Sequence, residues 1–499
     1  MSVGADAGDG PSLLTQVRGA LDSAGRAYEG TAAAAEVAEL VRRLDAPLRV
    51  AIAGKVKAGK STLLNALVGE ELAPTDAGEC TKIVTWYVDG IACRVTMHQQ
   101  DGTPARQVPF SREQGAMDVD LGGTPAEQVD RLVIEWPSSS LRSMTLIDTP
   151  GIASLSTSVS ARTHEFLSSS DDHLTPADAV LYLMRHLHTS DVNFLETFHD
   201  QEFSQPTPVN AIAVLSRADE IGVGRLDSME SAERIAARYR TDAKVRRLCQ
   251  TVVPVAGLLA QSGSSLRESE YRSIALLTQA PAEEVDRLLL SADRFGRDSL
   301  SVGVTPIERQ NLLDRLGLFG VRLAVSLVRD GQVRTSTELS EALVARSGLD
   351  HLRAVLRSQF AARRDVLKAR SAMLGLQALL RRHPVAGGEA IAGELERVSS
   401  AAHELTEIRL LNALRAGSID VKPDEAEAME RLLGAHGTSI PARLGLPDSA
   451  TVDDQRAAML EALGRWQRRA ENPLSSREVA DAARELVRTC SGIYVRLWE

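Results

Sequence analysis

Residues 54–61 read Gly54-Lys55-Val56-Lys57-Ala58-Gly59-Lys60-Ser61, and this stretch decides the fold. It matches the pattern GxxxxGK[ST], a glycine-rich loop whose backbone N–H groups turn inward to cradle phosphates at a helix N-terminus. The apolar run at 49–53 predicts a strand before the loop, and the residues at 62–67 predict a helix after it. Strand, loop and helix in this order predict a nucleotide-binding P-loop.

Within the loop, each residue type suits a different part of a bound nucleotide. Lys60 is expected to reach the β- and γ-phosphates, and the Ser61 hydroxyl to ligate Mg²⁺. We expect nucleotide contacts from the whole loop and the first helical residues: Gly54, Val56, Lys57, Ala58, Gly59, Lys60, Ser61 and Thr62.

A second phosphate-sensing motif, Asp148-Thr149-Pro150-Gly151, follows the strand predicted at 144–147. In a DxxG motif at this position, Asp148 holds Mg²⁺ through a water and the Gly151 N–H senses the γ-phosphate. The loop between the two motifs offers Thr81 as the switch threonine that completes the Mg²⁺ shell, with Thr75 as the rival candidate.

A third motif, Ser216-Arg217-Ala218-Asp219, follows the strand predicted at 211–215, where GTPases carry [NT]KxD. Asp219 is placed to accept hydrogen bonds from guanine N1 and N2, a donor pair that adenine lacks. Arg217 is expected to lie over the purine, but Ser216 and Arg217 depart from the usual residues and leave the strength of base selectivity open. After the strand at 251–255, Ala256 and Gly257 stand where a ribose and base loop is expected.

The residue after Gly151 is Ile152, where Ras-like switches carry a water-orienting glutamine. Hydrolysis must therefore be assisted by a switch backbone, a cation in the P-loop or a partner subunit. Only seven of the 57 basic residues are lysines, and four of these lie within 55–82. Lys57 is one of them, and we regard it either as a catalytic charge stabiliser across the β–γ bridge or as a solvated lysine.

The strands around these motifs predict an α/β fold with a mainly parallel sheet covered on both faces. We expect seven of them, at 50–53, 83–88, 132–136, 144–147, 179–184, 211–215 and 252–255. Residues 12–45 and about 257–345 have helical patterns, and the apolar stretch 312–328 predicts a buried helix pair. From Leu349 a long helix runs to His383-Pro384, followed by helical segments at 391–414, 451–466 and 475–498, the last opened by a capping box from Ser475 to Glu478.

The basic residues along that long helix are Arg363, Arg364, Lys368, Arg370, Arg381 and Arg382. Their simplest interpretation is a solvated face. The alternative is a surface for lipid phosphates or for a neighbouring acidic domain.

Charge and hydropathy exclude several classes of protein. The formal net charge of −10 falls on residues 1–360, because residues 361–499 carry equal numbers of basic and acidic side chains. An acidic nucleotide-binding region argues against nucleic acid as a partner. No apolar run approaches the roughly 20 residues that span a bilayer, and nothing at the N-terminus marks a secretory signal. We therefore expect a cytoplasmic protein whose membrane contact is peripheral.

Together the motifs resemble bacterial dynamin-like GTPases. More narrowly, the stretches GKVKAGKSTLLNALVG, APTDAGECTKIVTWY, SRADEIG, VVPVAGLLA and RLGLFG resemble the mycobacterial isoniazid-inducible dynamin-like proteins, in particular their shorter C-type form. The resemblance runs along the whole chain.

The resemblance implies a GTPase domain at 47–360 with Mg²⁺ as cofactor and GTP as substrate. It also implies a helical neck or stalk bundle built from 1–46 and 361–499, and dimerisation through the GTPase domains. Two hypotheses follow. The chain either remodels or severs the cytoplasmic membrane, in contact with anionic lipid at its inner face, or it is a GTP-switched assembly partner of a paralogous dynamin-like protein without direct lipid binding. Hinges are expected near Ala46-Pro47 and within 360–364.

Overall fold

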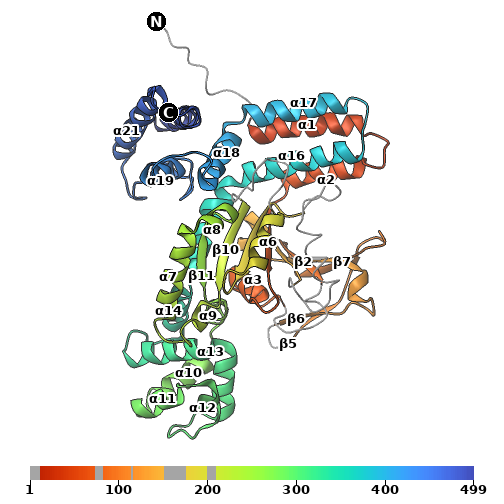
Figure 1. Ribbon diagram of the computed structural model, residues 1–499. Coiled ribbons are helices and arrows are strands. Elements are labelled where there is room, and N and C mark those ends of the chain that lie inside the picture. The colour runs from red at the N-terminus through yellow and green to blue at the C-terminus, as the bar shows by residue number, and fades with distance from the viewer. Residues whose placement is uncertain (1–11, 74–82, 114–115, 151–175, 199–209, 499) are drawn as a thin grey trace.

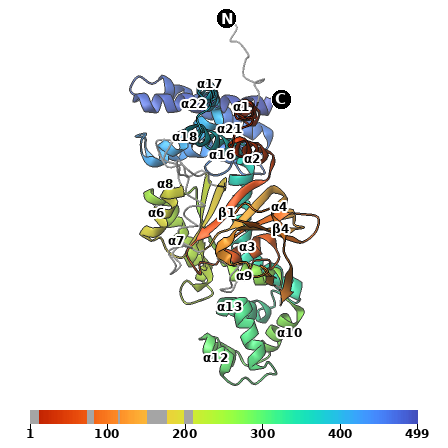
Figure 2. The same cartoon turned by 90° about the vertical axis from the view of Figure 1, so that its right-hand side faces the viewer.

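The computed structural model describes residues 12–73, 83–113, 116–150, 176–198 and 210–498. A nine-stranded sheet lies at the centre of the molecule, between helices at both ends (Figures 1 and 2). Its strand order is β11 (Val252–Val255), β10 (Ala211–Ser216), β9 (Ala179–Met184), β1 (Leu48–Gly54), β8 (Met144–Asp148), β2 (Val84–Asp89), β7 (Val129–Trp136), β3 (Arg94–Gln99) and β4 (Arg106–Gln107).

The P-loop strand β1 pairs in parallel with both β8 and β9, and the parallel arrangement continues through β10 to β11. Alternate residues of these strands face opposite sides, so Val50 and Ile52 join a different core from Ala51 and Ala53. Helix α3 (Lys60–Val68) packs on the first face, and α6 (Thr189–Phe198), α7 (Ser228–Thr241) and α8 (Ala243–Leu248) pack on the second. The predicted mainly parallel, doubly covered sheet is therefore confirmed.

The sequence did not predict the antiparallel part of the sheet. Strand β2 runs antiparallel to β8 and parallel to β7, and β3 and β4 continue the sheet as antiparallel edge strands. A separate two-stranded sheet, β5 (Phe110–Glu113) with β6 (Ala116–Val119), lies in the same region, together with η2 (Ala126–Gln128) and α4 (Ser139–Ser143). β2 and β7 correspond to the strands expected at 83–88 and 132–136, but β3, β4, β5 and β6 were not expected, because they are short or rich in polar residues and their apolar periodicity is weak.

Between β11 and the long helix, the predicted helical segment forms its own apolar core, at the opposite end of the sheet from the N-terminal helices (Figure 1). Its helices are α9 (Gly257–Ser264), α10 (Glu268–Leu277), α11 (Ala282–Leu288), α12 (Ala292–Arg297), α13 (Pro306–Arg329) and α14 (Ser336–Arg346). Helix α13 is interrupted at Gly317, which has φ 65° and ψ 172°. Two helical segments with buried apolar residues therefore meet at Gly317 within α13, and the expected buried helix pair at 312–328 is confirmed.

The remaining helices form two groups with separate apolar cores (Figure 1). One group consists of α1 (Leu13–Ala27), α2 (Ala34–Asp45), α16 (Arg364–Arg382) and α17 (Gly388–Ala401). The other consists of α18 (His403–Ala416), α19 (Pro423–Leu432), α20 (Ile440–Leu444), α21 (Val452–Glu471) and α22 (Arg477–Trp498), whose core is continuous with that of the sheet. Among the described residues, no helix is both long and apolar enough to cross a membrane.

The long helix changes its geometry where we expected a hinge. It starts as α15 (Leu349–Val355), continues as a π-helical turn η5 (Leu356–Phe360) and a 3₁₀ turn η6 (Ala361–Arg363), and resumes as α16. Such turns inside a helix often mark a functional hinge.

The interpretation of the basic residues on this helix as a solvated face is wrong for half of them. Arg363, Lys368 and Arg370 are buried. Arg363 donates to the carbonyls of Leu433 and Gly434, and Lys368 donates to those of Leu44 and Ala46. Buried charges need such partners, and the carbonyls that end a helix supply them.

The capping box predicted from Ser475 to Glu478 is wrong, because a single serine one residue later caps α22. Ser476 Oγ accepts from the N–H of Val479 at 3.3 Å and is the capping side chain, while Ser475 Oγ donates to the Arg469 carbonyl.

Candidate functional site

The predicted phosphate site lies at the carboxyl end of β1. Gly54 has φ 150°, and a Cβ there would lie 2.5 Å from the Leu183 carbonyl oxygen, so this close approach requires glycine. Gly59 is left-handed and precedes α3 without a side-chain cap, which leaves the N-terminal N–H groups of α3 open to a phosphate.

Lys60 folds back over this loop. Its Nζ donates to the carbonyls of Gly54 at 3.2 Å and Lys55 at 3.4 Å. Burial lowers the pKa of Lys60, and the charge of Asp148 partly opposes that shift. A phosphate oxygen offers this ammonium a stronger partner than two neutral carbonyls.

Asp148 and Ser61 meet beside the loop, as the sequence predicted. Ser61 Oγ donates to Asp148 Oδ2 at 3.0 Å. The other carboxylate oxygen, Oδ1, is buried and has no hydrogen-bond partner among the described residues. Burial raises the pKa of Asp148. A hydroxyl and an unsatisfied carboxylate oxygen are the hard oxygen ligands that Mg²⁺ takes, directly or through water, so these residues fit a Mg²⁺ ion.

Two residues assigned to this site, Thr81 and Gly151, lie outside the described residues, as does the rival Thr75. Lys57 is described: it has φ 62° and an exposed side chain at the rim of the loop. Its role as a charge stabiliser stays a prediction.

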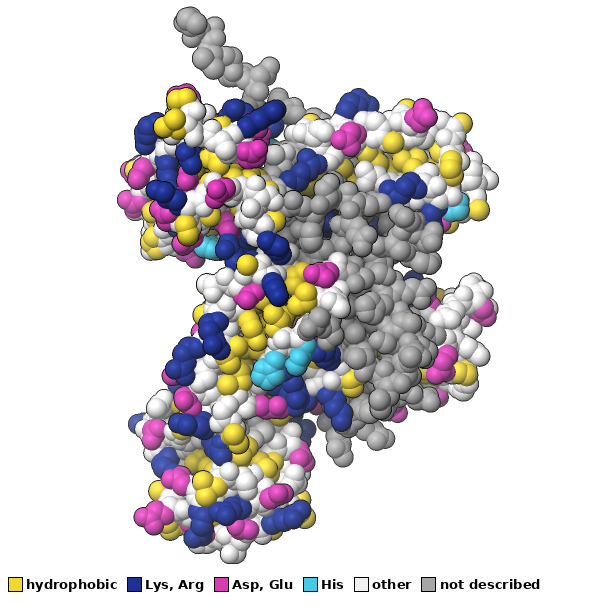
Figure 3. Space-filling view, in the orientation of Figure 1, with side chains coloured by type: hydrophobic (Ala, Val, Ile, Leu, Met, Phe, Trp, Pro, Cys, Tyr) yellow, Lys and Arg dark blue, Asp and Glu magenta, His cyan; other side chains and the backbone are white. Residues whose placement is uncertain are grey.

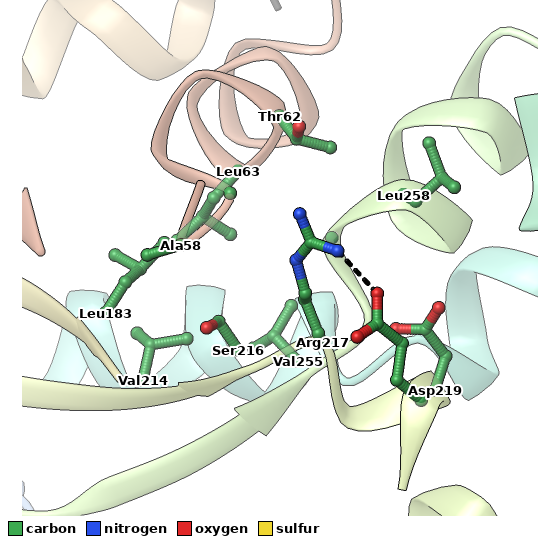
Figure 4. Close-up of a pocket in the computed structure, with 13 residues that line it drawn as sticks. Ala58, Thr62, Leu63, Leu183, Val214, Ser216, Arg217, Asp219, Val255 and Leu258 are labelled. Carbon is green, nitrogen blue, oxygen red and sulfur yellow. Dashed lines mark hydrogen bonds and ion pairs between the residues drawn. The ribbon is translucent and has the colours of Figure 1, made fainter. Parts of the chain in front are cut away.

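A pocket beside the P-loop collects the residues predicted to read the base (Figure 4). It is lined by Ala58, Gly59, Thr62, Leu63, Leu183, Val214, Ser216, Arg217, Asp219, Glu220, Val255, Gly257 and Leu258. Asp219 lies in the 3₁₀ turn η4 (Ala218–Glu220), and burial raises its pKa. Ala256 does not line this pocket, because it is fully buried and its N–H donates to the Ser347 carbonyl.

Arg217 takes a position that its place in the motif did not reveal. One guanidinium nitrogen donates to Glu220 Oε1 at 2.6 Å and another to the Lys57 carbonyl at 3.0 Å. Figure 4 shows the side chain standing between the P-loop side of the pocket and Leu258. Arg217 therefore joins the base motif to the P-loop, and the Ser216 hydroxyl donates to the Met184 carbonyl.

Sequence reasoning missed the apolar walls Leu63, Leu183 and Leu258 and the partner Glu220. It also missed the ion pair between Lys55 and the buried Asp191, 3.1 Å long, which holds the P-loop against α6. Tyr182 OH donates to the other oxygen of Asp191 at 2.6 Å. The lysine cluster pointed to Lys55, but no sequence pattern pointed to Asp191.

Comparison with known proteins identifies the family of the chain. A protein-family model of the dynamin family matches residues 50–216, from the P-loop strand to the base motif. The chain is also 39% identical over 490 residues to the isoniazid-induced protein IniC of two Mycobacterium tuberculosis strains, CDC 1551 / Oshkosh and H37Rv. That match covers 97% of this chain and 98% of the relative.

The chain belongs to the dynamin family. It is accordingly a GTPase of the bacterial dynamin-like type, and GTP is its substrate. The bacterial dynamin-like protein of Nostoc punctiforme is 34% identical over 118 residues, 21% of this chain and 16% of that protein. A solved structure of an oligomerised bacterial dynamin pair covers 97% of this dynamin-family chain with a TM-score of 0.33 and 12% identity, too low a score for a structural conclusion.

Proposed function

We propose that this dynamin-family GTPase uses Mg²⁺, dimerises through its GTPase domains when GTP is bound, and transmits hydrolysis to its helical groups so as to remodel or sever the cytoplasmic membrane from its inner face. The observation that carries the proposal is a continuous set of contacts from the P-loop strand to the helices.

This connection starts where α2 ends and β1 begins. The buried Arg43 of α2 pairs with Asp178 at 2.9 Å, and the other oxygen of Asp178 accepts from the Arg49 N–H of β1 at 2.9 Å. Lys368 of α16 donates to the Leu44 and Ala46 carbonyls beside Pro47. A shift at the phosphate end of β1 would therefore be felt at α2 and α16.

The second connection runs from α8, which packs on the sheet, to α18 and α19 of the C-terminal helical group. Arg415 and Glu430 pair at 3.3 Å, Glu430 also pairs with Arg246 of α8, and the Arg247 guanidinium donates to the Ala416 carbonyl at 2.8 Å. In the proposed swing, the helical groups move as rigid bodies relative to the sheet, and the contacts at these two connections rearrange. The hinges of this motion are proposed near Ala46-Pro47 and within 360–364.

In the proposed mechanism, bound Mg²⁺ neutralises charge on the β- and γ-phosphates. Ser61 and Asp148 would hold the ion, Asp148 through water, and the Lys60 ammonium would exchange its loop carbonyls for the phosphates. Thr81 and Gly151 are proposed to complete the Mg²⁺ shell and to sense the γ-phosphate. Because Ile152 cannot orient water, a lone subunit should hydrolyse GTP slowly, and pairing of two nucleotide faces is proposed to order the site, with Lys57 stabilising charge.

Assembly is tested by turnover as a function of concentration. Activity per subunit should rise with protein concentration, and rise further with anionic liposomes, which should change shape in the presence of GTP. Flat specific activity over a hundredfold range, with light scattering showing monomers alongside a transition-state analogue, would refute dimerisation-dependent hydrolysis.

One observation favours the alternative of an assembly partner that does not touch lipid. The buried Arg363, Lys368 and Arg370 remove half of the basic surface that lipid phosphates would meet. On the described face in Figure 3, acidic and basic side chains are interspersed over the C-terminal helical group. If turnover responds to a paralogous dynamin-like protein and not to liposomes, the alternative is correct.

Asp219→Asn should shift nucleotide preference from guanine towards xanthine, because the amide presents a donor where the carboxylate accepts. Competition of GTP and XTP for binding measures the shift, which we expect to reach about tenfold. Asp227→Asn makes the same change at a half-buried carboxylate outside the pocket, where Asp227 pairs with Arg225 at 3.3 Å, and is the matched control. Wild-type protein that binds ATP as tightly as GTP would contradict the role of Asp219.

Thr81→Ala should keep GDP binding and lower hydrolysis by about a hundredfold or more, because the hydroxyl is needed only once γ-phosphate and Mg²⁺ order the loop. Single-turnover hydrolysis and GDP affinity measure the two effects. If Thr75→Ala loses activity and Thr81→Ala does not, Thr75 is the switch threonine.

A further inference from the structure

The loop after the base motif has an unusual backbone. Gly222, Val223 and Gly224 all have positive φ angles, 66°, 65° and 66°. Valine is β-branched, so this conformation is strained and persists only where surrounding contacts enforce it. The Val223 side chain is 80% exposed and does not supply those contacts.

Arg322 of α13 supplies them. Its guanidinium donates to the Val223 carbonyl at 2.9 Å and to the Gly224 carbonyl, and on its other side to the Leu289 carbonyl at 2.9 Å. Burial lowers the pKa of Arg322. A planar fork that meets several carbonyls at once fixes a loop more tightly than a single ammonium would.

The same loop touches the base-reading residue. A Cβ on Gly224 would lie 3.5 Å from the Asp219 carbonyl oxygen, 3.5 Å from Arg322 and 3.6 Å from Phe319 of α13. The backbone of Asp219 is therefore packed, through Gly224, against α13. Displacing this loop moves the carboxylate that has to meet two donors on the guanine edge.

Helix α13 carries a second arginine on the other side of its break at Gly317. Arg315 pairs with Glu71 at 2.6 Å and with Glu270 at 2.9 Å, and donates to the Ser265 carbonyl at 2.8 Å. Glu71 directly precedes Leu72 and Ala73, whose N–H groups both donate to Asn65 Oδ1 of α3. Arg315 and Asn65 thus hold residues 71–73 in place against α3.

We propose that α13 positions both ends of the nucleotide site, with Arg322 setting guanine selectivity through the loop 222–224 and Arg315 fixing residues 71–73 against α3, the helix that carries Lys60 and Ser61. Both are positioning residues and act through other groups. The proposal rests on the proposed base-reading role of Asp219.

The test compares GTP with ITP, whose base lacks the 2-amino group and so offers Asp219 one donor instead of two. Arg322→Gln should raise the KM for GTP about tenfold and that for ITP much less, with little change in kcat. Arg315→Gln should lower kcat several-fold and leave the ratio of the two KM values unchanged. Arg329→Gln, on the same helix and paired with Asp286 at 3.3 Å, is the matched control and should change neither.

Thermal unfolding of each variant identifies any general loss of structure. If Arg322→Gln does not fold, Arg322→Lys keeps the charge, loses the fork and should still lower the GTP-to-ITP preference. An equal rise in both KM values, or an Arg315→Gln variant that alters selectivity in place of kcat, would overturn the proposal. Asp219→Ala distinguishes failure of the base-reading role of Asp219 from failure of the positioning role of Arg322. If Asp219→Ala leaves the GTP-to-ITP preference unchanged, Asp219 does not read the base. If Asp219→Ala lowers that preference and Arg322→Gln does not, only the role of Arg322 is refuted.

Discussion

Lys60→Ala is expected to weaken GTP binding by about a thousandfold while the protein stays folded. The Lys60 ammonium is shared between the Gly54 and Lys55 carbonyls, and burial lowers its pKa, so keeping it charged in the folded protein costs free energy. With nucleotide bound, the same ammonium makes charge-assisted bonds to phosphate, worth about 1.5–3 kcal/mol each. Two such bonds correspond to about three orders of magnitude in affinity.

Calorimetric titration with GTP, and thermal unfolding without it, measure the two halves of this prediction. Lys244→Ala removes the same charge from an exposed position on α8 and should bind GTP normally. Near-normal GTP affinity of Lys60→Ala would remove the assignment of the phosphate site. A large fall in stability without nucleotide would show that the lysine also serves the fold.

The phosphate side of the site could be predicted because its residues are local in the sequence. Gly54, Lys60 and Ser61 lie in one loop between a strand and a helix, and Asp148 ends the strand that pairs with β1. Backbone direction at the end of a parallel strand brings such residues together without knowledge of distant packing.

The base side could be predicted only in part. Asp219 lies three residues after the end of β10, in a motif that could be recognised. Leu183 and Leu258 come from other elements and are ordinary apolar residues in the sequence. The anchoring of Arg217 by the Lys57 carbonyl depends on the left-handed backbone at both residues, which nothing in their side chains indicates.

Helical periodicity also misled us about Lys368. A charged side chain with no known partner is predicted to be exposed, but the partners of Lys368 are backbone carbonyls at the end of α2, more than 300 residues earlier. Backbone acceptors cannot be recognised from the pattern of side chains in a sequence. The contacts that join the helices to the sheet were therefore beyond prediction, although the hinge positions were expected.

Asp148→Asn should abolish Mg²⁺-dependent hydrolysis and at the same time stabilise the nucleotide-free protein. The loss of hydrolysis should reach about a hundredfold or more, because an amide oxygen holds Mg²⁺ and its water far more weakly than a carboxylate does. The gain in stability follows from burial. Asp148 Oδ1 has no partner among the described residues and burial raises the pKa of the carboxyl, so its charged form is costly in the folded state.

The cost of burying the charged Asp148 carboxylate predicts how the stability of the protein changes with pH. Because the pKa of Asp148 is raised on folding, the folded protein binds more protons than the unfolded one between the two pKa values. The contribution of this carboxyl to stability therefore falls as pH rises from the unfolded pKa of about 3.9 through the raised folded value. Asp148→Asn should remove that fall, and Mg²⁺ should raise the unfolding temperature of the wild type but not of the variant.

The matched control is Asp178, a second buried carboxylate, which directly precedes β9. Unlike Asp148, it has partners on both oxygens, the Arg43 guanidinium and the Arg49 N–H, each at 2.9 Å. Asp178→Asn should destabilise the protein by about 3 kcal/mol, since it leaves a buried arginine without its countercharge. The change from Asp to Asn is thus expected to stabilise the protein at Asp148, the proposed Mg²⁺ ligand, and to destabilise it at Asp178, which joins α2 to β1. If both variants lose stability equally, the unsatisfied oxygen of Asp148 is not a reserved ligand, and the Mg²⁺ assignment fails with it.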